Sequence, residues 1–332
     1  MPNTYYDIHV HIAGRGDGHT GCWFSPQRFN SIAFRIIRWS LGLRRDEPDL
    51  DSALRARILS YISTPPAVEA PEYGEDRLGV VVLAHDWPRD ARGEVLTELA
   101  DFYVPNEYVL ALAKAGHHLM AGVSIHPYRS DALAELDRCH SAGAVLVKWL
   151  PTSQNFSPAD QRCRPFYQEM ARRNLPLLCH TGSEGATRNL DKRVNDPRVL
   201  IPALEAGVKV IAAHSGLRSS PHDADYFDIW HAMLKDYPHL YGDTASLFGL
   251  RARRFCRVWQ RSGVAERLLH GSDWPVPSSP WWFVGILPWR RIRQLAKIAN
   301  PLWRDLATKR ALGLPREIFT RAAELLLRRH KS

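Results

Sequence analysis

The chain has 332 residues, a length that suits one (β/α)8 barrel of ~250 residues with insertions. Hydrophobic residues make up 45% of it, enough for a large core, but no uninterrupted apolar run approaches the ~20 residues of a transmembrane helix. The N-terminal stretch MPNTYYDIHVH has neither the charged nor the apolar region of a signal peptide. We therefore expect a cytoplasmic protein.

The net charge of +9 comes from basic residues that are scattered along the chain and densest in its last quarter. This distribution favours a solvated basic surface over a nucleic-acid-binding face. The five cysteines form no CxxC motif, so neither a disulfide framework nor a cysteine-based zinc site is expected. They are Cys22, Cys139, Cys163, Cys179 and Cys256.

Eight short apolar runs alternate with helical patterns along the chain. The runs are 5–12, 78–85, 118–126, 144–150, 175–180, 208–214, 239–244 and 267–273. Helical patterns cover 28–43, 50–62, 92–115, 130–142, 159–173, 197–206, 223–236 and 251–262, and loops are expected at 13–26 and 64–76. Continuous Val/Leu/Ile runs are typical of parallel strands buried on both faces.

Eight strand-then-helix units predict a single α/β domain over 1–332, a (β/α)8 TIM barrel. An open doubly wound sheet is the alternative, but no GxGxxG follows the first run. Residues 13–76 form an insertion after strand 1, expected to cover the barrel mouth as a lid or to make an oligomer contact. Residues 275–332 form a C-terminal helical extension.

Two histidines lie near the end of the first strand. His9 and His11 are two residues apart, so a regular strand turns both side chains to one face, where they can grip one divalent metal. Alone, such a pair is more often structural. Asp7 is expected on the same face, one pleat deeper, where it would orient a histidine or fill the barrel floor.

Further polar residues end later strands. His180 precedes Thr181-Gly182, His214 precedes Ser215-Gly216, and Asp273 follows Gly271-Ser272. In a barrel these ends meet at one mouth, where catalysis occurs. Lys148 lies within the apolar run AVLVKWL, and a buried amine there needs a partner, a modification or an anionic substrate.

Together these motifs resemble the amidohydrolase superfamily, in its branch of amidohydrolase-related (family 2) TIM-barrel metal-dependent hydrolases. That branch also holds non-oxidative decarboxylases related to aminocarboxymuconate semialdehyde decarboxylase. The resemblance spans residues 5–275 and is carried by Asp7-x-His9-x-His11, Lys148, His180-Thr181-Gly182, His214-Ser215-Gly216 and Gly271-Ser272-Asp273-Trp274-Pro275.

The resemblance implies that His9, His11, His180 and Asp273 bind a metal. His214 would bind a second metal or act beside the first, and Lys148 matches a position that is carboxylated and bridges two metals in binuclear members. The insertion is one departure from the family pattern, and His270, which we interpret as an ordinary strand residue rather than a second-shell group, is another.

The implied reaction is hydrolysis of a small ester, lactone or amide, with Zn2+ as the default ion and one or two ions per chain. Asp273 would take the proton from the attacking water, and His214 would hold the developing oxyanion or a second ion. A carboxylate on the substrate could meet Lys148, Arg188 or Arg218. Further mouth candidates are His85, Asp86, His126 and Glu184.

Three alternatives stay open. A decarboxylase of an aromatic or unsaturated acid would use the same metal site, although Lys148 favours hydrolysis. A metal nuclease is not favoured, because no basic stripe carries interleaved aromatics in the barrel section. Membrane binding through Trp281, Trp282, Trp289, Arg290, Arg291 and Arg293 is also not favoured, since such a stretch more often packs a helix on the barrel. We expect a small-molecule substrate and leave a homo-oligomer open.

Overall fold

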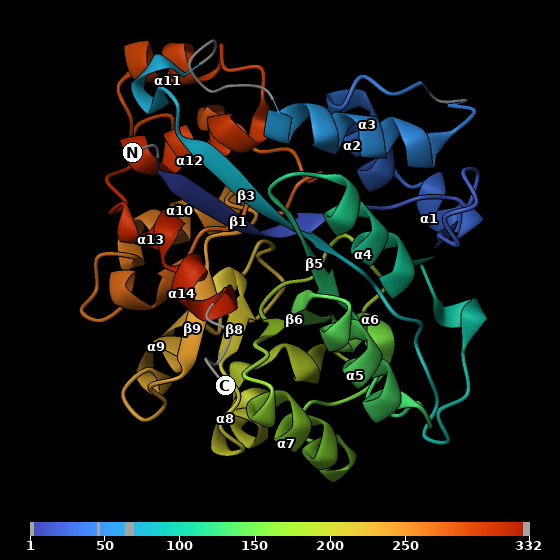
Figure 1. Ribbon diagram of the computed structural model, residues 1–332. Coiled ribbons are helices and arrows are strands. Elements are labelled where there is room, and N and C mark those ends of the chain that lie inside the picture. The colour runs from blue at the N-terminus through green and yellow to red at the C-terminus, as the bar shows by residue number, and fades with distance from the viewer. Residues whose placement is uncertain (1–2, 45–46, 64–69, 328–332) are drawn as a thin grey trace.

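The computed structural model describes residues 3–44, 47–63 and 70–327. Its centre is an eight-stranded parallel sheet in the order β1-β3-β5-β6-β7-β8-β9-β10 (Figure 1). The strands are β1 (Thr4–His11), β3 (Arg77–Leu83), β5 (Leu119–Val123), β6 (Ala144–Trp149), β7 (Leu177–His180), β8 (Val210–Ala213), β9 (Leu240–Asp243) and β10 (Leu268–Leu269).

The sheet closes through backbone bonds between its first and last strands. The amide of Ile8 donates to the carbonyl of His270 at 3.0 Å, and the amide of Asp273 donates to the carbonyl of His9 at 2.8 Å. The predicted (β/α)8 barrel is therefore confirmed, and each apolar run gives one of its strands.

Helices surround the barrel. Those of the N-terminal insertion are α1 (Pro26–Phe29), α2 (Ile32–Ser40) and α3 (Leu50–Ser63). The later helices are α4 (Asn106–Ala115), α5 (Ala132–Ser141), α6 (Pro151–Gln154), α7 (Arg164–Arg172), α8 (Ile201–Glu205), α9 (Phe227–Met233), α10 (Gly249–Val258), α11 (Trp289–Leu295), α12 (Pro301–Ala311), α13 (Glu317–Thr320) and α14 (Ala322–Leu326). None of those in the described part of the chain is long and apolar enough to cross a membrane.

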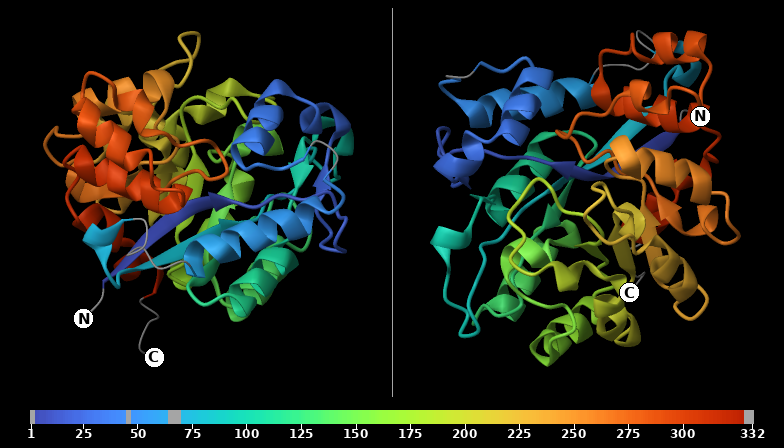
Figure 2. Two further views of the ribbon diagram at one scale, coloured as in Figure 1. Left: turned by 90° about the horizontal axis from the view of Figure 1, so that it is seen from above. Right: turned by 180° about the vertical axis from the view of Figure 1, so that it is seen from behind.

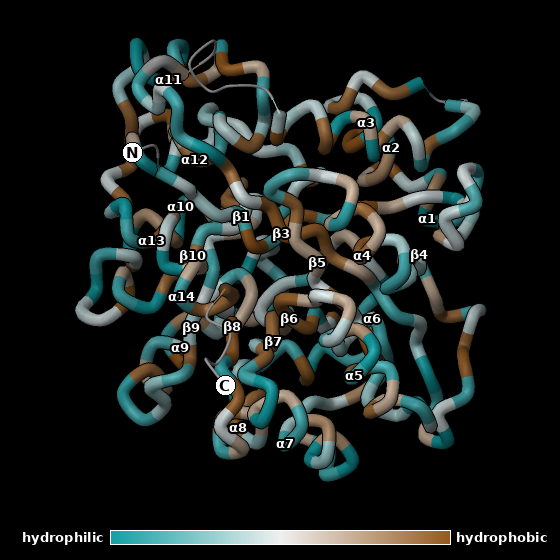
Figure 3. Tube along the Cα trace, in the orientation of Figure 1, coloured by the Kyte–Doolittle hydropathy of each residue, from teal (hydrophilic) through white to brown (hydrophobic). Residues whose placement is uncertain are grey.

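Alternating strand side chains build two packed layers. Val81 and Leu83 of β3 point into the barrel, whereas Val80 and Val82 pack against the surrounding helices. Figure 3 shows the strands as the most hydrophobic part of the trace, with polar residues gathered towards the outside.

The C-terminal helices close one end of the barrel. Ala322 and Leu325 of α14 join the interior cluster, and α14 lies in front of the strands in Figure 1. The view from behind in Figure 2 shows the opposite end, where the strands' carboxyl ends lead into the loops. The closed floor leaves this opposite end as the open mouth.

One predicted helix is wrong in its first half. Residues 92–103 form turns, a short 3-10 helix (Thr97–Leu99) and the short strand β4 (Phe102–Tyr103), and the α-helix covers only 106–115. β4 pairs antiparallel with β2 (Trp23–Phe24), which lies in a segment expected to be loop. This pairing joins residues far apart in sequence, so local periodicity could not indicate it.

Candidate metal centre

All six residues predicted as metal ligands or catalytic groups line one pocket of about 110 Å3 at the barrel mouth. They are His9 and His11 from β1, Lys148 from β6, His180 from β7, His214 directly after β8, and Asp273 after β10. The strand order brings them together because parallel strands present their carboxyl ends at one edge.

Three of these side chains form a tight group. His9 Nε2 lies 3.2 Å from His11 Nε2, and Asp273 Oδ1 lies 3.4 Å from the first and 3.3 Å from the second nitrogen. Two atoms bound 2.0–2.1 Å from a tetrahedral ion would be about 3.4 Å apart. Burial alone would raise the pKa of Asp273, but nearby His9, His11 and Lys148 lower it to about 2. The group therefore fits one divalent ion.

A buried carboxylate orients His9. Asp243, the last residue of β9, accepts from His9 Nδ1 at 2.7 Å and from the backbone amides of His214 at 2.7 Å and Ala245 at 3.1 Å. The proton of His9 thus stays on Nδ1, and Nε2 offers its lone pair to the group. Asp243 was not among the predicted site residues, although it ends a strand as a carboxylate, the same signal that singled out Asp273.

His180 offers a free ring nitrogen. Its Nδ1 lies 3.5 Å from Glu184, whose carboxylate also accepts from the amides of Ala186 at 2.6 Å and Thr187 at 2.7 Å. His180 Nε2 is buried and has no hydrogen-bond partner among the described residues. Leaving such an atom unpaired is costly, and a metal ion would satisfy it. His180 lies outside the tight group of three on the pocket wall.

His214 is held by a carbonyl and a buried arginine. Its Nδ1 lies 3.2 Å from the carbonyl oxygen of Ala245, a contact that needs a proton on Nδ1, and 3.4 Å from Arg251 Nη1, a contact that needs a lone pair there. The shorter contact favours the tautomer with the proton on Nδ1. Burial, reinforced by the Arg251 charge, holds the His214 pKa well below its usual value. The neutral ring keeps a lone pair on Nε2. Arg251 lies in the basic run RARR, and no sequence pattern distinguished it.

The Lys148 amine lies beside His9 Nε2, one of the three atoms of the tight group. The distance from Lys148 Nζ to His9 Nε2 is 3.1 Å, and the lysine side chain is only 2% exposed. Burial lowers the pKa of the amine, which makes the neutral form more accessible. A lysine in this position is chemically suited to the carboxylation that the resemblance implies, and its modification stays a prediction.

Two glycines of the predicted motifs are required by close packing. A Cβ on Gly271 would come within 2.7 Å of the Cβ of His9, so only glycine lets β10 approach β1 at this level. Gly182 has a φ of +78°, and a Cβ there would lie 2.5 Å from the carbonyl oxygen of Leu217. His214 and Asp273 themselves have φ values of 61° and 68°, a strained backbone conformation found at many active sites.

Asp7 does not orient a histidine ring. The register of β1 against β3 shifts between Asp7 and Val10, and Ile8 packs inside the barrel, so simple alternation does not extend from Asp7 to His9. The Asp7 carboxylate accepts from the backbone amides of Ser272 at 2.9 Å and His9 at 3.2 Å. It ties β1 to the last strand beneath the site.

His270 is fully buried beneath the same site. Its ring nitrogens lie 3.9 Å from Asp7 and 4.0 Å from Asp305, beyond hydrogen-bond distance. The residue directly follows β10 and does not line the pocket.

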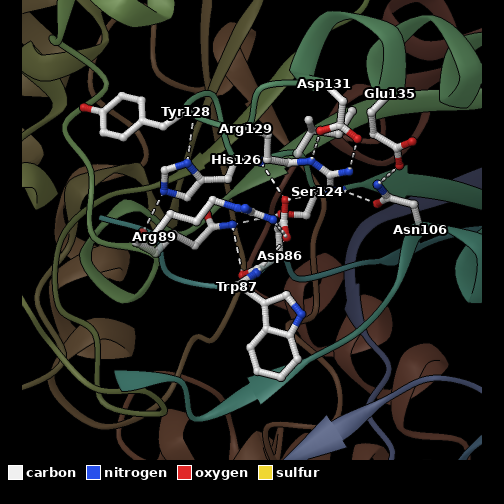
Figure 4. A network of polar contacts seen from close by, with 12 residues as sticks. Asp86, Trp87, Arg89, Asn106, Ser124, His126, Tyr128, Arg129, Asp131 and Glu135 are labelled. Carbon is white, nitrogen blue, oxygen red and sulfur yellow. Dashed lines mark hydrogen bonds and ion pairs between the residues drawn. The ribbon is translucent and has the colours of Figure 1, made fainter. Parts of the chain in front are cut away.

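Several other predicted mouth residues serve the scaffold. Asp86 accepts from the amide of His126 at 2.8 Å and from Arg129 at 3.3 Å, which joins the ends of β3 and β5 (Figure 4). His85 stacks on Phe102 with ring centroids 4.3 Å apart. Among the described residues that line the pocket, none of the three predicted residues His85, Asp86 and His126 appears.

Of the three cations predicted to meet a substrate carboxylate, only Lys148 lines the pocket. Arg188 and Arg218 are absent from the described pocket lining, whereas Arg28 of the insertion is part of it, with its guanidinium 3.1 Å from Asp101. Glu184, a predicted mouth candidate, does line the pocket.

The outer pocket wall is aromatic. Phe24 of β2, Phe34 of α2 and Phe102 of β4 line it, and the ring of Phe24 packs 4.6 Å from that of Phe34 and 5.9 Å from that of Phe102. Two of these residues come from 13–76, so the insertion contributes directly to the pocket.

Comparison with known proteins gives one sequence match. The family profile described as Amidohydrolase matches residues 6–297. No curated protein matches the chain.

Solved structures share the fold at low sequence identity. An uncharacterised TIM-barrel protein from Bordetella bronchiseptica has a TM-score of 0.58 at 18% identity, with 98% of each chain covered. A Pseudomonas putida protein described as a 2-pyrone-4,6-dicarboxylic acid hydrolase has a TM-score of 0.56 at 15% identity, again with 98% of each chain covered. 2,6-Dihydroxybenzoate decarboxylase has a TM-score of 0.52 at 13% identity, with 98% of this chain and 99% of that chain covered.

Proposed function

Because the chain belongs to the amidohydrolase family, we propose that it is a metal-dependent hydrolase acting on a small ester, lactone or amide. The observation that carries the proposal is the donor set at the mouth: the tight group of His9, His11 and Asp273, together with the buried, unpaired Nε2 of His180. Three nitrogens and one carboxylate oxygen favour Zn2+.

A divalent ion at this position would polarise a substrate carbonyl and lower the pKa of a water molecule from 15.7 towards 7. The side chains of the pocket supply the remaining steps. Asp273 is ionised and adjacent to both β1 histidines, so it can accept the proton of the attacking water and return it to the leaving group.

His214 has a revised role in this proposal. Since its Nδ1 proton donates to the carbonyl of Ala245, the neutral ring cannot also donate to an oxyanion. Its Nε2 can instead accept a hydrogen bond from the attacking water and hold it in line with the carbonyl. A neutral imidazole suits this task, and burial, reinforced by the Arg251 charge, keeps the His214 pKa low enough for the ring to be neutral.

The aromatic wall supports a substrate with an apolar body. Phe24, Phe34 and Phe102 can bury a small ring or a short chain, while Arg28 can pair with a carboxylate on it. The same features favour an aromatic or unsaturated acid as substrate for decarboxylation, which is the alternative reaction at this site.

The test begins with protein stripped of metal by a chelator and reloaded with Zn2+. Lactones, aryl esters and anilides are scored for acid release, and aromatic and unsaturated acids for CO2 release. We expect acid release that disappears with the metal and returns with Zn2+, and His180→Ala should lose both bound zinc and activity. Full activity in the metal-free protein would contradict the proposal, and CO2 release without hydrolysis would favour the decarboxylase.

A further inference from the structure

The outward face of α2 is apolar and exposed. Ile32, Ile36 and Trp39 are 74%, 51% and 82% exposed, and their spacing lines them up on one side of the helix. A surface helix normally turns polar side chains to water. In Figures 1 and 2, α2 lies at the outer edge of the molecule, away from the packed barrel core.

The inward face of the same helix holds it in place. Phe34 and Ile37 line the pocket, and the buried guanidinium of Arg38 lies 4.6 Å from the ring centre of Phe29 and 5.5 Å from that of Phe34. The residues of this inward face attach α2 to the barrel, whereas much of the surface of Ile32, Ile36 and Trp39 stays exposed. Their exposure calls for an external partner.

The groove on this face is lined by two arginines and by no carboxylate among the described residues. Residues 18–45 contain five arginines and no aspartate or glutamate, but Arg28 lines the pocket and pairs with Asp101, and acidic residues resume at Asp46. Arg35 lies on the exposed face, and it lines a shallow groove together with Ile32, Ile36, Arg38, Trp39 and Leu43. A second copy of the chain would bring like charges together here, whereas an anionic surface complements them.

A second segment leading from the pocket has the same composition. Residues 274–304 contain no acidic residue. Within them Trp281, Trp282 and Trp289 are 44%, 43% and 58% exposed, although the sequence favoured their packing on the barrel. Pro275 and Val276, at the start of this segment, line the same pocket as α2. Exposed tryptophan beside arginine is typical of residues that enter the headgroup region of a bilayer.

We propose that the outer face of α2 docks on an anionic lipid bilayer, with Trp39, Ile36 and Ile32 entering the headgroup region and Arg35 pairing with lipid phosphates. Since the inner face of this helix lines the pocket, docking brings the pocket next to the lipid surface. The proposal is independent of the reaction at the metal centre.

The test is sedimentation of the full chain with vesicles of phosphatidylcholine alone or with roughly one third phosphatidylglycerol. We expect binding to the anionic vesicles that weakens with salt. The double variant Ile36→Ser/Trp39→Ser should lower the partition coefficient about tenfold or more, and Arg35→Glu should also lower it. Leu133→Ser, which changes a 47% exposed leucine on α5, is the matched control and should bind like the original chain.

A second readout follows the position of one side chain. Brominated lipids quench tryptophans that enter the bilayer, and Trp39→Phe keeps an apolar side chain while removing that reporter. We expect quenching in the original chain and a clear loss of it in Trp39→Phe, with binding nearly retained. Circular dichroism and metal content verify that every variant is folded.

Three results would overturn the proposal. One is absence of binding to anionic vesicles. Another is equal vesicle binding by the α2 variants and the original chain. This result would include the case in which only Trp281→Ser/Trp282→Ser abolishes vesicle binding. The third is a dimer in sedimentation equilibrium that Trp39→Ser dissociates, because the face would then be covered by a second copy.

Discussion

At the scale of single residues, the site depends on where three histidine rings keep their protons. His9 donates from Nδ1 to Asp243, His180 has Nδ1 beside Glu184, and His214 donates from Nδ1 to a backbone carbonyl. Each ring is thereby left with Nε2 available at the pocket. The sequence predicted the rings because they end strands. It did not predict their partners, because these pairings join different strands and loops.

Replacement of Asp243 by asparagine should weaken metal binding by about 10–100-fold, since the amide nitrogen must face either His9 Nδ1–H or two backbone amides. Competition with a chromophoric chelator measures the affinity. Asp160→Asn, at a carboxylate outside the pocket, serves as the control and should leave it unchanged. Equal affinities for the two variants would count against an orienting role of Asp243.

His126 should make the fold sensitive to acid. Its Nδ1 accepts from the amide of Tyr128 at 3.1 Å and its Nε2 donates to the carbonyl of Gln154 at 2.9 Å, an arrangement open only to the neutral ring. Burial lowers the His126 pKa to about 3. The hydrogen bond to Gln154 acts in the opposite direction and raises this pKa, whereas the charges of nearby arginines lower it further.

Because this folded-state pKa lies below the unfolded value of 6.5, the unfolded chain binds the proton first, and stability falls as pH drops below 6.5. At about pH 5 the loss from this group is about 2 kcal/mol. Unfolding measured at about pH 7.5 and about pH 5 should show a smaller pH effect in His126→Gln than in the original chain. An equal pH effect in both proteins would show that His126 does not contribute to the loss of stability at low pH.

At the scale of elements, the barrel strands could be predicted and the elements over the mouth could not. Continuous apolar runs such as 144–150 indicate buried parallel strands directly. The β2–β4 pairing instead joins Trp23 to Tyr103 and Phe24 to Phe102 across a wide sequence separation. From sequence alone, these aromatic residues fit a helix or a buried core position equally well. Only tertiary packing turns Phe24 and Phe102 towards the pocket.

Helix α14, at the closed end of the barrel, is expected to stabilise the fold without contributing to the metal centre at the mouth. Leu325 of α14 packs with the interior residues Ile8, Val81 and Leu178 beneath the site. Leu325→Ala should reduce the free energy of unfolding by about 2–4 kcal/mol, because it leaves a cavity at the end of the barrel. Chemical denaturation measures the loss, and metal content should stay that of the original chain. A variant that lost metal without losing stability would contradict this separation of floor and site.

At the scale of the whole molecule, the candidate site lies at one end of the barrel, and apolar packing that stabilises the fold closes the other end. Apolar side chains of α14 close this end of the barrel, and the open end gathers ionisable groups that burial makes costly. The net charge of +9 is also uneven, since the two acid-free segments both adjoin the open end. The sequence showed the size of this charge, but its relation to the mouth depends on the fold.

The most direct test of the metal centre is anomalous diffraction at the zinc edge from crystals of active, zinc-loaded protein. We predict one anomalous peak enclosed by His9, His11, His180 and Asp273. A second peak would be accompanied by density for a carboxylate on Lys148. An active crystal with no anomalous peak at these residues would contradict the account.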